Sequence, residues 1–298
     1  MPPTIEQVLA AIPDLAGRTV RAERIPAGLT NTNYRVEVDG TPWFVRIPGA
    51  ATELLAVDRA NELHNTRAAA AVGVGPRVLH TLPEWDAFVL EWLPARTMSA
   101  ETLRAPGMPG RIADLLHRLH AGPRFRDDFD MVRLSERYLA VVDERDIAIP
   151  MGYRSHVGQF RRIGAALAVH PLPTVPCHND LLPENYLDDG QRLWIVDWEY
   201  SGNNDPTFEL GDTCQELGYD DAQTTELCAA YFGHATPALL ARMHLQMIMS
   251  DVGWTLWGAI QSHISTIEFD FEGYANERWA RAVAAIDGPE FEGWLQAV

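Results

Sequence analysis

Short runs of alternating apolar and polar residues fill much of the first hundred positions. These runs carry β-branched or aromatic side chains, and Gly, Pro, Asp and Asn gather between them, which is the pattern of strands joined by turns. The five runs are residues 19–25, 33–38, 43–47, 76–82 and 87–92. Helical periodicity marks residues 4–12, which Thr4 can cap, and an Ala-rich stretch at residues 52–72. We therefore predict an N-terminal lobe of about five strands with one long helix, in which the first three strands form an antiparallel meander.

Helical periodicity dominates from residue 109 onward. The helical segments that it predicts are residues 109–121, 133–146, 153–169, 221–233, 237–262 and 273–286. Residues 177–200 are an exception, because short strand-like pieces there alternate with polar clusters. A proline follows the last N-terminal strand at residues 93–95, which favours a hinge. The expected fold class is α+β, with two lobes, residues 1–94 and 95–298, on either side of a cleft.

The chain of 298 residues is strongly acidic, and all of its basic side chains are arginine. It has 24 Arg, no Lys and 41 Asp or Glu, which gives a formal charge of −17. This balance leaves no broad basic face, so nucleic acid and anionic membranes are not expected partners, whereas a cationic substrate is favoured. The absence of Lys excludes a Walker-A phosphate loop, Schiff-base chemistry and a lysine general base. Phosphate would have to be bound by Arg, backbone amides or a metal ion.

Three features predict the compartment. Cys177, Cys214 and Cys228 are odd in number and form no C-x-x-C pair, which fits a reducing cytoplasm better than a disulfide framework. The first 16 residues lack the basic and apolar regions of a signal peptide. No uninterrupted apolar run reaches the length of about 18 residues that a membrane span needs. We expect a cytoplasmic protein without a membrane partner, and the sequence does not specify the oligomeric state.

Two polar clusters between residues 178 and 199 carry the clearest chemistry. The first, HNDLLPEN, places Asp180 five residues before Asn185, and the second follows an apolar strand with Asp197. Phosphoryl transfer in the kinase manner needs this set: one carboxylate orients and deprotonates a hydroxyl, while an amide and a second carboxylate hold Mg²⁺. Asn and Asp also favour caps and Asx turns, which is the preferred interpretation for Asn179 alone. For the ordered set of three, we prefer the catalytic interpretation.

These clusters resemble motifs of the choline kinase and aminoglycoside phosphotransferase superfamily, which has the protein-kinase-like fold. The resemblance covers most of the chain, residues 22–285, and implies ATP-dependent transfer of the γ-phosphoryl group to a hydroxyl of a small molecule. It implies that Asp180 is the catalytic base, that Asn185 and Asp197 hold Mg²⁺, and that His178 braces the loop. The implied fold has a small antiparallel sheet with one long helix, followed by a larger, mainly helical lobe.

N-terminal residues agree with this family. Gly28 lies at a strand turn, where glycine lets the backbone approach a polyanion, and its segment is similar to the nucleotide-covering loop of choline kinases. The resemblance implies that Arg46 contacts the ATP phosphates and that Glu62 is its ion-pair partner. Without the resemblance, the preferred interpretations are a hairpin turn for Gly28, a surface side chain for Arg46 and a solvated helical side chain for Glu62. The implied ATP-site positions are Gly28, Thr30, Asn31, Asn33, Arg46, Glu62 and, in the adenine-binding hinge, Glu91 and Leu93.

A C-terminal aromatic block indicates which hydroxyl is phosphorylated. Trp254 and Trp257 share a helical face, an arrangement that usually marks hydrophobic core. The block nevertheless closely resembles the choline-binding segment of choline kinases, whose rings surround a quaternary ammonium by cation–π attraction. Glu216 would add a carboxylate, although an exposed helical Glu is the alternative. The implied substrate positions are Asp180, Tyr200, Glu216, Trp254, Trp257, Phe271 and Tyr274.

We expect an ATP- and Mg²⁺-dependent kinase that converts choline to phosphocholine. Ethanolamine kinase is the nearest alternative. A primary ammonium gains from hydrogen-bond acceptors, however, and Phe271, in place of the Tyr more familiar in this family, offers fewer. Another amino alcohol or an aminoglycoside is a more distant alternative acceptor, and an aminoglycoside would need a wide pocket, which the aromatic block disfavours. A catalytically weak, nucleotide-binding pseudokinase is disfavoured by the presence of Asp180, Asn185 and Asp197 together.

Overall fold

The N-terminal part is a five-stranded antiparallel sheet, seen in a computed structural model that describes residues 2–26, 28–49 and 52–298. Its strand order is β1-β2-β3-β5-β4. The strands are β1 (Val20–Ile25), β2 (Asn31–Val38), β3 (Thr41–Pro48), β4 (Val78–Leu82) and β5 (Ala87–Glu91). The predicted meander is confirmed: β2 and β3 are joined at Asp39 and Gly40, whose φ angles of 49° and 84° are those of a two-residue hairpin turn. Helix α1 (Ile5–Ala10), capped by Thr4 as predicted, precedes the sheet.

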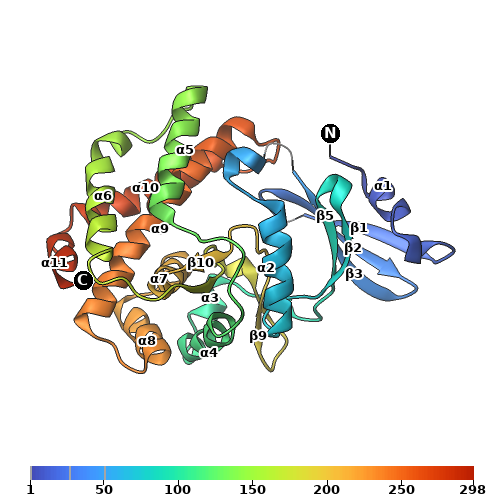
Figure 1. Cartoon of the computed structure of the whole chain (residues 1–298), viewed down its shortest axis with the longest axis horizontal. Helices are drawn as coiled ribbons and strands as arrows, with labels where there is room; N and C mark the ends of the chain where they lie inside the picture. The colour runs from blue at the N-terminus through green and yellow to red at the C-terminus, as the bar shows by residue number, and fades with distance from the viewer. Residues whose placement is uncertain (1, 27, 50–51) are drawn as a thin grey trace.

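The helix predicted at residues 52–72 is wrong as a single element. A 3₁₀ turn, η2 (Thr52–Leu55), ends where Ala56 takes a φ of 61°. This left-handed backbone interrupts the helix. Helix α2 (Arg59–Ala71) begins anew after Asp58, whose side chain accepts the N–H of Asn61. Figure 1 shows α2 between the sheet and the helical part of the molecule.

Polar contacts dock α2 on the C-terminal part. The side-chain amides of Asn61 and Asn65 donate to the backbone C=O of Ser201 at 2.8 and 3.0 Å. Both asparagines are buried, so their amides need these partners. The same face carries Glu62, which is completely buried. The docking therefore fixes where the carboxylate of Glu62 lies.

The C-terminal part is mainly helical, as predicted. Its helices are α3 (Ala100–Leu103), α4 (Met108–His120), α5 (Met131–Arg145), α6 (Val157–Leu167), α7 (Pro206–Leu217), α8 (Asp221–Phe232), α9 (Pro237–Ile264), α10 (Phe271–Ile286) and α11 (Phe291–Ala297). Short strands form two small ladders. One has the order β6-β8-β9, with β6 (Arg96–Thr97), β8 (Tyr186–Asp188) and β9 (Leu193–Ile195), and the other pairs β7 (Val175–Cys177) with β10 (Gly202–Asn204). Sequence reasoning missed α3, α7 and α11.

Helix α9 is the central element of this part. Helices α5, α7, α10 and α11 pack against it, and nearly every side chain between residues 241 and 261 is buried. Its surroundings form one large apolar core, while a second core lies around α4 and a third under the sheet. Within the described residues, no helix is long and apolar enough to cross a bilayer. The division into lobes at residue 94 stays a prediction.

Candidate active site

Hydrogen bonds hold the loop between β7 and β8, which carries Asp180, from several sides. The side-chain amide of Asn179, whose φ of 68° lies in the left-handed region, donates to the C=O of Tyr200 (3.1 Å). Nε2 of His178 donates to the C=O of Val196 (2.9 Å), and its Nδ1 accepts the N–H of Asp180 (3.3 Å). Burial lowers the pKa of His178 and favours the neutral ring that an accepting Nδ1 requires. These contacts fit the bracing role implied for His178.

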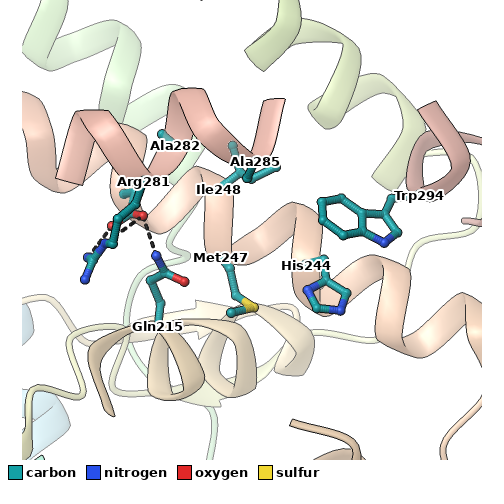
Figure 2. A pocket seen from close by; sticks show the side chains of 9 residues that line it. Gln215, His244, Met247, Ile248, Arg281, Ala282, Ala285 and Trp294 are labelled. Carbon is teal, nitrogen blue, oxygen red and sulfur yellow. Dashed lines mark hydrogen bonds and ion pairs between the residues drawn. The ribbon is translucent and has the colours of Figure 1, made fainter. Parts of the chain in front are cut away.

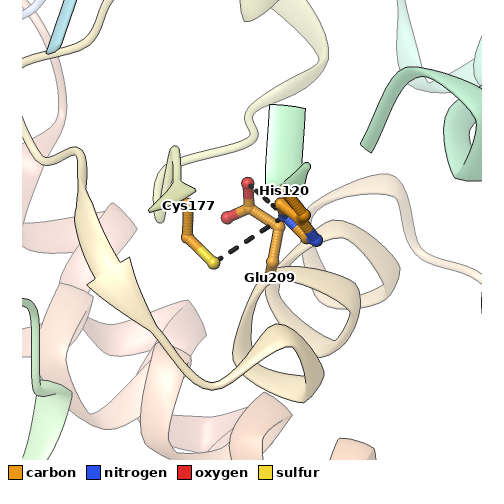
Figure 3. Close-up of side chains that lie close together, drawn as sticks. All are labelled: His120, Cys177 and Glu209. Atoms are coloured by element: carbon orange, nitrogen blue, oxygen red, sulfur yellow. Dashed lines mark hydrogen bonds and ion pairs between the residues drawn. The ribbon is translucent and has the colours of Figure 1, made fainter. Parts of the chain in front are cut away.

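Glu209 supports the same loop from α7. Its two carboxylate oxygens accept the backbone N–H groups of His178 and Asn179, each at 2.7 Å. Figure 3 shows this carboxylate beside two further buried groups: Nε2 of His120 lies 3.7 Å from Glu209 and 3.7 Å from Sγ of Cys177. Because Glu209 accepts two backbone N–H groups of this loop, we interpret the trio as a support that holds the loop in place.

The three predicted catalytic residues lie next to one another. Nδ2 of Asn185 donates to the C=O of Asp180 (2.8 Å), and the N–H of Val196 donates to the C=O of Asn185 (3.0 Å). Strands β8 and β9 pair antiparallel, which brings Asn185 beside the residues that follow β9. Asp197, with a φ of 72°, lies there, and 28% of its side chain is exposed. An amide oxygen and a carboxylate thus adjoin Asp180, the predicted base, and this donor set suits Mg²⁺.

Arg46, on β3, connects the sheet by charge to the segment that follows β9. Its guanidinium contacts the carboxylates of Glu62 and Asp197, so the predicted contact with Glu62 is present. Sequence reasoning missed a second buried cation, Arg59, whose Nη1 lies 2.6 Å from Glu62 and 3.1 Å from Glu199. Its spacing of three residues from Glu62 is the signal of a helical ion pair. Arg46 and Arg59 thus alternate with the carboxylates of Asp197, Glu62 and Glu199, and this pairing offsets the cost of burying each charge.

The segment from Gly28 to Asn31, at the start of β2, contacts the C-terminal part. Gly28 has a φ of 109°, and a Cβ there would lie 2.9 Å from Nδ2 of Asn33, so a side chain is disfavoured. Thr30 follows in the bend that leads into β2. Nδ2 of Asn31 donates to Oε2 of Glu199 (3.0 Å). The side chain of Asn31 is therefore already engaged, and we expect phosphate contacts from this segment to come from its backbone.

The predicted adenine-binding segment begins at the end of β5. The N–H of Glu91 donates to the C=O of Arg77 (2.9 Å), and the C=O of Leu93 accepts the N–H of Ala95 (2.8 Å). The carboxylate of Glu91 also pairs with Arg77, at 2.7 Å. The N–H of Glu91 is therefore used by neighbouring backbone. An adenine contact in this segment would have to use other backbone groups, and the hinge role stays a prediction.

The five predicted aromatic residues form one cluster. Trp254 and Trp257, on α9, have ring centroids 6.5 Å apart. The ring of Tyr200 lies 4.9 Å from Trp254, and its hydroxyl accepts Nε1–H of Trp257 at 2.8 Å. Phe271 and Tyr274, in the first turns of α10, lie 5.8 and 5.5 Å from Trp257. Rings gathered in this way can attract a cation through their faces.

Glu216 lies beside this cluster but has an internal partner. Nη2 of Arg278 lies 2.7 and 2.6 Å from its two carboxylate oxygens, and both side chains are buried. The guanidinium carbon of Arg278 lies 3.6 Å from the ring centroid of Tyr274. The resemblance implied that Glu216 adds a carboxylate to the substrate site, and this role stays a prediction. In the structure the charge of Glu216 is balanced by Arg278.

Asp212 ties the catalytic loop to the aromatic cluster, and sequence reasoning missed it. Its Oδ2 accepts the N–H of Leu181 (2.9 Å), the residue after the predicted base, and its Oδ1 accepts Nε1–H of Trp254 (3.2 Å). The sequence did hold a signal for Asp212: it lies three residues after Glu209 and four before Glu216, a spacing that places the three acids on one helical face.

Burial raises the pKa of Asp180 well above its ordinary range, and four nearby carboxylates add to the effect. They belong to Asp212, Asp197, Glu216 and Glu199. Burial likewise raises the pKa of Asp212 to about 7. A positive charge nearby stabilises the ionised form of such groups. Carboxyl groups with raised pKa values are typical of acid–base sites, and these favour a cationic ligand.

A small cavity of about 60 Å³ lies between α7, α9, α10 and α11 (Figure 2). On one side the carboxylate of Asp251 pairs with Arg281 and accepts from Gln215, each at 2.5 Å. On the other, the rings of His244 and Trp294 stack with centroids 4.6 Å apart. The five aromatic residues do not line it, so this cavity belongs to helix packing.

Comparisons with known proteins agree with this arrangement. A model of the phosphotransferase enzyme family (APH) matches residues 21–245. A crystal structure of a choline/ethanolamine kinase family protein from Mesorhizobium loti superposes with a TM-score of 0.85 and 41% identity, covering 98% of this chain and 96% of that one. Choline kinase LicA from Streptococcus pneumoniae has the same fold, with a TM-score of 0.81 at 24% identity over 94% and 98% of the two chains. Ethanolamine kinase 2 from Mus musculus is 29% identical over 86% of this chain and 74% of its own length.

Fold and site together define a phosphotransferase that acts on an alcohol group. The chain belongs to the phosphotransferase enzyme family, in the branch that contains the choline and ethanolamine kinases. The predicted family and fold class are thereby confirmed.

Proposed function

We propose that this enzyme transfers the γ-phosphoryl group of ATP to the hydroxyl of choline, giving phosphocholine and ADP. The cluster of five aromatic rings carries the proposal, because it adjoins the loop of Asp180 through the hydrogen bonds of Asp212. Trp254 and Trp257 would receive the cationic head, and the hydroxyl would then be directed toward Asp180. Cation–π attraction suits a trimethylammonium group, which has no N–H to donate.

In this mechanism Asp180 accepts the hydroxyl proton as the choline oxygen attacks the γ-phosphorus and ADP leaves. Arg46 would balance negative charge on the phosphates, as would backbone amides of the segment that contains Gly28. Asn185 and Asp197 fit Mg²⁺, because amide and carboxylate oxygens are its preferred ligands. When bound, Mg²⁺ offsets charge on the β- and γ-phosphates. Positioning and electrostatics thus supply most of the catalysis.

The acceptor groups of Glu216 and Tyr200 already have internal partners, which supports choline over ethanolamine. A primary ammonium brings three N–H donors that need partners. Both oxygens of Glu216 accept from Arg278, and Phe271 offers no hydroxyl. The hydroxyl of Tyr200 already accepts from Trp257. Ethanolamine stays the alternative, supported by the ethanolamine kinases among the relatives.

A substrate panel tests the proposal. Purified enzyme with ATP and Mg²⁺ would be assayed on choline, ethanolamine and kanamycin, and kcat/KM compared. We expect choline to be preferred over ethanolamine by roughly tenfold or more, equivalent to about 1.4 kcal/mol, and kanamycin to be unreactive. Preference for ethanolamine would support the alternative. No phosphorylation of either amino alcohol would refute both.

A further inference from the structure

Gln261 connects two regions that lie 232 residues apart in sequence. Its Nε2 donates to the backbone C=O of Leu29 at 2.9 Å, and only 3% of the Gln261 side chain is exposed. Leu29 belongs to the segment that contains Gly28, which would cover the ATP phosphates. Because a buried side-chain amide requires partners, this bond holds the segment in one place against α9.

The same face of α9 carries Trp257 of the aromatic cluster. Gln261 follows Trp257 by four residues, so the two side chains lie one turn apart on that face. The Leu29 side chain also packs against the apolar core that includes Trp254 and Trp257. One helix thus lines the place proposed for the cation and holds the segment proposed to cover ATP.

We infer that Gln261 is a positioning residue that couples the two substrates. Choline held against Trp254 and Trp257 would favour the position of α9 in which Gln261 reaches Leu29, and nucleotide bound under the segment at Leu29 would in turn favour that same position. By linkage, each ligand must then raise the affinity for the other by the same factor. This inference rests on the proposed function, because it requires a cationic alcohol at the aromatic cluster.

A second attachment keeps the segment close when the Gln261 bond is removed. Asn31 donates to Glu199 at 3.0 Å, independently of α9. Loss of the Gln261 bond is therefore expected to loosen the segment without detaching it. Ser262 offers a matched control, because its hydroxyl donates to the C=O of Ala259 (2.7 Å) and its bond stays within α9.

Calorimetry of the full chain with Mg²⁺ and AMP-PNP, with and without choline, measures the coupling. Couplings of this kind are typically about 5- to 150-fold, and we expect the wild type and Ser262→Ala to fall within that range. In Gln261→Ala we expect choline to change AMP-PNP affinity by less than about twofold, while choline binding alone stays within about twofold of wild type. Gln261→Glu, which keeps the size and loses the donor, carries the same expectation if the alanine variant does not fold.

Wild-type coupling retained in Gln261→Ala or Gln261→Glu would overturn the inference, as would an uncoupled wild type. If Gln261→Ala weakened choline binding in the absence of nucleotide as much as it weakened the coupling, Gln261 would have only a packing role. That result would also overturn the inference. These outcomes leave the proposed function intact when choline is still phosphorylated. Failure of the wild type to bind or phosphorylate choline would instead refute the proposed function.

Discussion

Replacing Trp257 by phenylalanine weakens the proposed choline site without removing its ring. The indole Nε1–H that orients the Tyr200 hydroxyl at 2.8 Å is lost, at a cost of about 1 kcal/mol. Trp is also the strongest ring for cation–π attraction, and the exchange loses about 0.5–1 kcal/mol more. The sum of about 1.5–2 kcal/mol corresponds to a decrease of roughly 10- to 30-fold in kcat/KM for choline.

Steady-state assays of Trp257→Phe would vary choline and ATP separately. The KM for ATP is expected to stay within about twofold, because Trp257 contacts other residues of the aromatic cluster. Trp279→Phe is the matched control: Trp279 is equally buried on α10, and its Nε1–H donates to the C=O of Met151 at 2.9 Å, outside the cluster. The two variants should lose similar thermal stability, while choline kinetics change only in the first.

Two results would refute this reasoning. Equal losses of choline kcat/KM in Trp257→Phe and Trp279→Phe would show that general destabilisation is the cause. Equal effects of Trp257→Phe on choline and on its uncharged isostere 3,3-dimethylbutan-1-ol would show packing rather than attraction of a charge, since only the charged substrate feels the ring quadrupole.

Two further predictions concern Asp180 and Arg46. Burial and neighbouring carboxylates raise the pKa of Asp180, so kcat/KM for choline should rise with pH through an apparent pKa above the ordinary value of about 3.9. Bound choline stabilises the ionised carboxylate, so the corresponding limb of kcat should lie at lower pH; coincident limbs would argue against a nearby cation. Arg46→Lys keeps the charge but cannot bridge Glu62 and Asp197 with a planar fork, and we expect the KM for ATP to rise about tenfold with the KM for choline nearly unchanged. A selective effect on choline would contradict the role given to Arg46.

The parts of the fold that could be predicted are those with local signals. Strand alternation and turn residues identified the sheet, but α7 was missed; it contains Pro206 and Gly211, residues with poor helix propensity. In the structure Pro206 occupies the first turn after the Asp205 cap, where its missing N–H costs nothing. Gly211 is required by tertiary packing, since a Cβ there would lie 2.8 Å from the C=O of Met243 on α9. Such a close approach leaves no local signal.

The same limit applies to the site. Asp180 and Asn185 lie within one loop, so their proximity followed from sequence spacing. The ion pair of Glu216 with Arg278 could not be predicted, because it depends on how α7 and α10 pack across 62 residues of chain. It means that a cation at the aromatic cluster would meet a carboxylate whose charge Arg278 already balances.

Product analysis of the wild type and Asp180→Asn tests the central claim most directly. Both proteins would be incubated with ATP, Mg²⁺ and choline and followed by ³¹P NMR, with nucleotide binding measured in parallel. The account predicts phosphocholine and ADP in equal amounts from the wild type, and almost none from Asp180→Asn despite retained ATP binding. Release of inorganic phosphate in place of phosphocholine, or turnover by Asp180→Asn at the wild-type rate, would contradict it.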